Sequence, residues 1–79
     1  MAVLQYEEAA SLLSKAISLN PHSTMLHKNR GYAYFCNDQF ASAIPDFERA
    51  LTLKSEEPEN IYFLLGISYK QELKYKEAF

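Results

Sequence analysis

Few side chains in this chain could carry out chemistry, and their spacing argues against it. His22 and His27 lie five residues apart, which is neither the i,i+3 nor the i,i+4 spacing that places two metal ligands on one face of a helix. Cys36 is the only cysteine in the 79 residues, so the sequence offers neither a disulfide framework nor a cysteine-based zinc site. The sequence therefore predicts that the protein binds no metal.

The remaining candidates for catalysis also lack the surroundings that they would need. The two glycines, Gly31 and Gly66, are 35 residues apart and cannot form a glycine-rich phosphate loop. Ser11, Ser14 and Ser18 are not flanked by the glycines of a nucleophile turn. We therefore expect a protein that is not an enzyme and that uses no cofactor.

Composition indicates one small soluble domain. Hydrophobic residues make up 48% and charged residues 23% of the chain, and the net charge is −2. Such mild acidity gives no basic patch for nucleic acid or for an anionic membrane. The beginning of the chain carries Glu7 and Glu8 and no basic stretch, which is unlike a signal peptide. We expect a cytoplasmic or nuclear protein that binds neither nucleic acid nor a membrane.

The chain repeats itself at a distance of 34 residues, and then at 35. A shift of 34 places Ala9 on Ala43 and Ala16 on Ala50. A shift of 35 places three further residues on identical partners, namely Gly31 on Gly66, Tyr34 on Tyr69, and Ala43 on Ala78. Because a fixed period of this length is the signature of a repeat architecture, it determines the expected fold.

Within each repeat, the apolar and small residues follow a helical period. Ala9, Leu13 and Ala16 step by four and then three residues, so they share one helix face. Asn20-Pro21, Asn37-Asp38 and the segment from Ser55 to Pro58 interrupt this period, and Ser23 and either Asn37 or Asp38 could cap helices. The expected helices span residues 2–19, 24–36, 39–53 and 58–72, with a fifth beginning at 74–79.

Small residues inside the expected helices predict close helix packing. Gly31 and Gly66 each lie mid-helix, where a glycine costs about 1 kcal/mol relative to alanine. Close approach of a second helix would offset that cost. Tyr34 and Tyr69 follow the glycines by three residues, so we expect both tyrosines to pack in the core. Pro45 lies within the third helix and predicts a bend or a lost hydrogen bond rather than a break.

These residues resemble the tetratricopeptide repeat family. The segments 26–34 and 40–43, followed by Phe47 and Ala50, look like one complete helix–turn–helix repeat. The resemblance implies an all-α fold, a right-handed solenoid of antiparallel helix hairpins. Its expected divisions are the second helix of a first repeat (1–21), a full repeat (22–56) and a truncated third repeat (57–79).

The resemblance implies a scaffold that binds a peptide or a partner helix on its concave face. By helical angle that face comprises Lys28, Asn29, Tyr32, Phe35 and Cys36, continued by Asn60, Phe63, Leu64, Ile67 and Lys70. The expected partner-binding residues within it are Lys28, Asn29, Tyr32, Phe35, Phe63, Ile67 and Lys70.

A second hypothesis is a structural one. The chain could be a piece of a larger helical repeat array, or could associate with itself through its end helices. A repeat buries its apolar face against its neighbours, so unpartnered end helices would favour either outcome.

Overall fold

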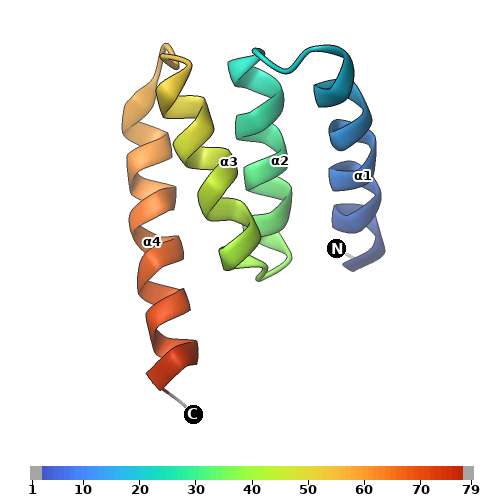
Figure 1. The fold of residues 1–79 in the computed structure, drawn as a ribbon. Coiled ribbons are helices and arrows are strands. Elements are labelled where there is room, and N and C mark those ends of the chain that lie inside the picture. Colours follow the sequence, from blue (N-terminus) through green and yellow to red (C-terminus); the bar gives the residue numbers. More distant parts are fainter. Residues whose placement is uncertain (1–2, 78–79) are drawn as a thin grey trace.

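Four helices account for most of the chain. The computed structural model describes residues 3–77, which form α1 (Val3–Leu19), α2 (Thr24–Cys36), α3 (Phe40–Thr52) and α4 (Pro58–Glu77). The helices stand in a row, each antiparallel to the one before it, with α1 at one end and α4 at the other (Figure 1). No strand occurs within residues 3–77, so the expected all-α hairpin fold is confirmed.

Local sequence signals explain most of the helix boundaries. The Ser23 hydroxyl accepts a hydrogen bond from the Leu26 amide at 3.3 Å and caps α2, as expected. Pro58 begins α4, where its missing N–H is not needed. Asn37 caps a helix as expected, since it is the C-cap of α2 and its amide donates to carbonyls of the last turn. Neither Asn37 nor Asp38 caps the beginning of α3, because Gln39 precedes α3 and makes no side-chain capping bond. Asp38 instead forms the turn, with a φ of 58°.

The expected break after residue 72 was also wrong, since α4 continues to Glu77. The equivalent turn after α2 uses Asp38 at a positive φ, which Asn and Asp tolerate better than most residues. The 35-residue shift places Glu72 and Leu73 where Asn37 and Asp38 stand, and both are good helix formers. The helix therefore has no residue that favours a turn here. Residues 78–79 of the expected fifth helix lie outside the described part.

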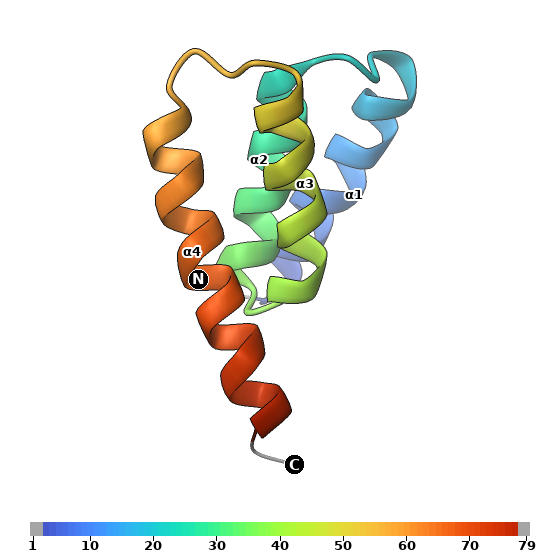
Figure 2. The same cartoon turned by 60° about the vertical axis from the view of Figure 1, so that its left-hand side comes forward.

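The core is centred on α3. Ala43, Phe47 and Ala50 on α3 and Ile61 on α4 have no exposed surface. Around this cluster pack the half-buried side chains of Tyr34, Phe35, Leu51, Leu64 and Leu65. Because α3 packs against both α2 and α4, its apolar residues hold both neighbours. Figure 2 shows α4 beside the hairpin of α2 and α3.

Pro45 does not break α3. The helix runs without interruption from Phe40 to Thr52, and Pro45 lies on its exposed side. Ala43 and Phe47 on either side of it are fully buried, so the packing of this face continues through the proline. The expectation of an unbroken helix is confirmed.

The two glycines have different environments. A Cβ atom added at Gly31 would lie 2.9 Å from two ring atoms of Phe47 and 3.2 Å from the Cβ of Asp46, so α3 approaches α2 too closely for a side chain. A Cβ atom added at Gly66 would meet no atom of the described residues within 4 Å. Close packing is therefore confirmed at Gly31, and the close packing expected at Gly66 is not present within residues 3–77.

This contrast predicts opposite effects of the same substitution. Gly31→Ala should lower the free energy of unfolding by about 1 kcal/mol, because the overlap with a rigid buried ring outweighs the gain in helix propensity. Gly66→Ala should raise it by up to about 1 kcal/mol, because only the propensity changes. Urea unfolding of both variants in dilute solution measures the two values. Shifts of the same sign would contradict the assigned packing.

Candidate functional site

A hollow on the face shared by α2 and α4 gathers most of the residues singled out by the sequence. Its volume is about 280 Å³. Three of its lining residues come from each helix, and all six form what we call the concave hollow: Lys28, Asn29, Tyr32, Asn60, Phe63 and Leu64. On each helix these positions differ by one, three or four residues, which places them on one face.

Two aromatic side chains in the concave hollow are open to solvent. Phe63 is 69% exposed and Tyr32 is 53% exposed. The Tyr32 ring stacks on the Phe35 ring with centroids 6.5 Å apart, which restricts its position. The neighbouring Cys36 thiol raises the pKa of the Tyr32 hydroxyl. The hollow thus offers two apolar surfaces with polar groups beside them.

Four of the seven expected partner-binding residues line the concave hollow: Lys28, Asn29, Tyr32 and Phe63. Phe35 is half-buried, and its ring lies 5.4 Å from that of Phe40 and 6.4 Å from that of Phe47. Its main contacts are therefore with the core. Ile67 is half-buried and Lys70 is exposed, and neither lines the hollow.

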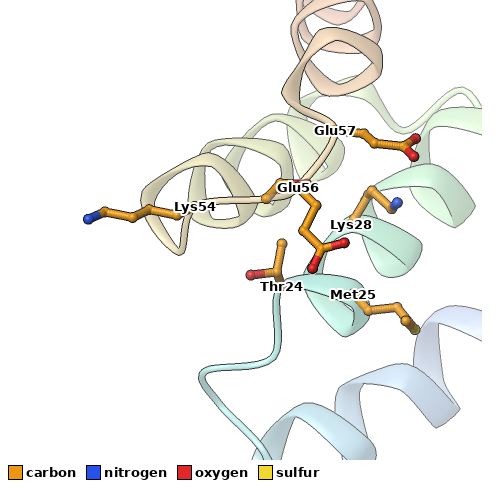
Figure 3. A pocket seen from close by; sticks show the side chains of 7 residues that line it. Thr24, Met25, Lys28, Lys54, Glu56 and Glu57 are labelled. Atoms are coloured by element: carbon orange, nitrogen blue, oxygen red, sulfur yellow. The ribbon is translucent and has the colours of Figure 1, made fainter.

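A second hollow lies beside the first and was not predicted from the sequence. Its volume is about 410 Å³, and Figure 3 shows its lining residues: Thr24, Met25, Lys28, Lys54, Ser55, Glu56 and Glu57. It forms because the loop between α3 and α4 folds over the start of α2, where the Thr24 hydroxyl donates to the Leu53 carbonyl at 3.3 Å. Since loop geometry is not encoded in helical periodicity, no sequence signal could have indicated it.

The two hollows share Lys28 but differ in chemistry. Glu56 and Glu57 bring negative charge to the second hollow beside Lys28, while the side chain of Lys54 extends away from it (Figure 3). No apolar aromatic residue lines this site. The exposed aromatics make the concave hollow the stronger candidate for a binding surface.

A buried ion pair joins the first three helices. Arg30 donates to Asp46 through Nε at 2.8 Å and through Nη2 at 2.7 Å, which raises the pKa of Arg30. Its Nη1 donates to the Ser14 hydroxyl of α1 at 3.0 Å. Asp46 is only 4% exposed. These hydrogen bonds run between helices, so the group holds α1, α2 and α3 together.

His27 belongs to the same buried region. Its Nε2 lies 2.9 Å from the Pro21 carbonyl, and its Nδ1 lies 3.7 Å from Asp46 Oδ1 without a hydrogen bond. Among the described residues, no three histidine, cysteine or acidic side chains are grouped so that they could hold a metal ion.

The predicted core role of Tyr69 was wrong. The Tyr69 side chain is 49% exposed, and its hydroxyl donates to a Glu48 carboxylate oxygen on α3. This hydrogen bond raises the pKa of Tyr69. Tyr34, the residue one repeat earlier, does pack against the core cluster. The difference arises because α3 lies close against this face of α2 at Gly31, whereas the half-exposed Tyr69 reaches α3 through its hydroxyl.

Comparison with known proteins agrees with this architecture. Residues 29–57, which include most of α2 and all of α3, match the family model for the tetratricopeptide repeat. This chain contains a tetratricopeptide repeat. The family expected from the sequence is thereby confirmed, and proteins of this family generally act by binding other proteins.

One curated relative extends the tetratricopeptide match. Human tetratricopeptide repeat protein 13 is 41% identical to this chain over 51 residues, which are 65% of the chain and 6% of the human protein. The chain therefore spans a small part of the length of that relative. No solved structure matches the chain. Among the described residues, no helix is both long enough and apolar enough to cross a membrane.

Proposed function

We propose that this tetratricopeptide repeat chain is a non-catalytic scaffold that binds a protein segment in its concave hollow. The observation that carries the proposal is the exposure of Phe63 and Tyr32 beside three polar side chains: Lys28, Asn29 and Asn60. When a partner covers an exposed aromatic ring, the free energy of binding becomes more favourable by about 25 cal/mol per Å² of apolar surface buried. The surrounding polar groups can fix the orientation of the bound segment.

The geometry favours a short extended peptide or one face of a helix. A hollow of about 280 Å³ accommodates a few side chains rather than a whole domain. An apolar side chain of the partner would contact Phe63 and Tyr32. The amides of Asn29 and Asn60 would bond to its polar atoms, and the ammonium group of Lys28 would favour a nearby acidic group.

Phe63→Ala should weaken the binding of such a segment by about 2 kcal/mol, or roughly 30-fold in Kd, because central aromatic anchors dominate small interfaces. Lys28→Ala should weaken it less, and the difference should shrink as salt is added. The probe is a peptide selected from a random phage-displayed library against the immobilised wild-type chain. Isothermal titration with the synthetic peptide measures Kd.

Tyr62→Ala is the matched control for Phe63→Ala. Tyr62 is the neighbouring aromatic residue, is similarly exposed at 62%, and does not line the concave hollow. It should leave Kd of the peptide unchanged. An equal loss of peptide affinity in the two variants, or an unchanged Kd for Phe63→Ala, would contradict the proposal.

A structural role is the second candidate function. The chain corresponds to 6% of the length of its human relative, which favours a place within a longer repeat array. An array of this kind would cover the end helices, and the peptide-binding hollow would remain on its concave side.

A further inference from the structure

The second hollow continues the concave hollow along α2. Thr24, Met25 and Lys28 line the second hollow, and Lys28, Asn29 and Tyr32 line the concave hollow. Met25, Lys28 and Tyr32 follow one another by three and then four residues, so they lie on one face of α2. A segment that leaves the concave hollow toward the beginning of α2 therefore passes Lys28 and enters the second hollow.

Two carboxylates without a partner border the second hollow. Glu56 and Glu57 line it and are both exposed. Within residues 3–77, neither carboxylate forms an ion pair or a hydrogen bond, although two lysines line the same hollow. Figure 3 shows that Lys54 extends away, so Lys28 is the cation that stays beside the two glutamates. The excess of negative charge favours a cationic group of a partner.

The remaining lining suits the stem of a long basic side chain. Met25 is 66% exposed and offers a flexible apolar surface below the carboxylates. Lysine and arginine pack their methylene groups on such a surface and keep the charged end in water. The hollow, of about 410 Å³, is also the larger of the two. An acidic side chain would meet two charges of its own sign there.

We propose that the segment bound in the concave hollow places a lysine or arginine side chain in the second hollow, beside Glu56 and Glu57. This inference rests on the proposed function and adds the chemistry of the partner. The segment carries an apolar residue for Phe63 and Tyr32 and a basic residue for the glutamates. Lys28 lies between these two points, where it suits an acidic group or a backbone carbonyl of the segment.

The rise of α2 sets the distance between the two partner residues. Met25 and Tyr32 are seven positions apart, which corresponds to about 10 Å along the axis of a helix. An extended segment advances about 3.3 Å per residue, so its apolar and basic residues should be about three positions apart. A helical segment running alongside α2 would need a spacing of about seven positions.

Two parallel selections from one random phage-displayed peptide library test this chemistry. One selection uses the wild-type chain, and the other uses the double variant Glu56→Lys, Glu57→Lys. We expect a lysine or arginine at one of these two spacings from an apolar residue in the wild-type peptides. The peptides of the double variant should keep the apolar residue and carry an acidic residue in place of the basic one. Wild-type peptides without the basic residue would overturn the proposal.

Isothermal titration with the synthetic wild-type peptide measures the effect of the carboxylates. Glu56→Gln combined with Glu57→Gln should raise Kd about three- to fivefold at low salt, and this difference should shrink as salt is added. With a peptide whose basic residue is replaced by methionine, the same two substitutions should leave Kd unchanged. Glu59→Gln is the matched control, because Glu59 is an exposed glutamate close by on α4 that lines neither hollow. It should leave Kd unchanged with either peptide.

Phe63→Ala separates a failure of this inference from a failure of the proposed function. If Phe63→Ala weakens binding while the paired glutamine variant binds like the wild type, the segment occupies the concave hollow alone, and this inference is overturned. If Phe63→Ala also binds like the wild type, both proposals are overturned. Equal effects of the glutamine variant on the basic peptide and on its methionine form would likewise overturn the contact with a basic residue.

Discussion

Phe47→Ala should lower the free energy of unfolding by about 3–5 kcal/mol, which is most of the stability available to a domain of this size. The Phe47 ring has no exposed surface, fills the space beside Gly31 and packs against Phe35. Its removal would leave a cavity between α2 and α3 that neither helix can close without losing other contacts. Urea unfolding followed by circular dichroism at a fixed low protein concentration measures the change.

Phe63→Ala provides the matched control, because it removes the same side chain from a position that is 69% exposed. It should change the free energy of unfolding by less than about 0.5 kcal/mol. Similar losses for the two phenylalanines would show that α3 does not form the centre of the core.

Asp46→Ala should lower the free energy of unfolding by about 3–5 kcal/mol, because it leaves the Arg30 guanidinium partly buried without its two charged hydrogen bonds. Glu48→Ala removes an exposed carboxylate from the same helix and should lower the free energy of unfolding by less than about 1 kcal/mol. Urea unfolding of both variants tests the difference.

A double variant separates the ion pair from simple loss of volume. Arg30→Leu combined with Asp46→Leu should recover most of the stability lost by Asp46→Ala, since paired apolar residues can replace a buried ion pair. An Asp46→Ala variant as stable as Glu48→Ala would contradict the role assigned to the pair.

The repeat period predicted the helices well because apolar and small residues recur at helical spacing where one helix packs against another. Ala43, Phe47 and Ala50 recur at helical spacing and are all fully buried. Gly31 also behaves as its position predicts, since a second helix is present to pack on it. Each of these residues has its packing partner within the described helices.

The same logic misjudged residues whose partner is not among the described helices. Gly66 and Tyr69 occupy the positions of Gly31 and Tyr34, but no described residue lies within 4 Å of a Cβ atom added at Gly66, and Tyr69 remains half exposed. The period alone indicates which face a residue occupies, not whether that face is covered. The turn expected after residue 72 is absent because no residue there favours a turn, so α4 continues to Glu77.

The binding surface was predictable in part. Helical angle, applied to the face that the family resemblance implies, selected Lys28, Asn29, Tyr32 and Phe63, which do meet in one hollow. It also placed Phe35 on this face, because angle does not reveal that a large ring near the helix edge can turn toward Phe40. The hollow formed by the loop before α4 was not predicted, because the residues of a loop follow no helical period.

Backbone amide NMR spectra recorded during titration with the selected peptide test the central claim most directly, because they locate the bound segment on the chain. We expect the largest shift changes at the residues of the concave hollow, and little change at the exposed Leu12 of α1 or at Tyr62 and Leu73 of α4. The spectra of Phe63→Ala should change far less at the same peptide concentration. Shift changes concentrated at Tyr62, Gly66 and Leu73, or at the loop before α4, would contradict a peptide-binding concave face.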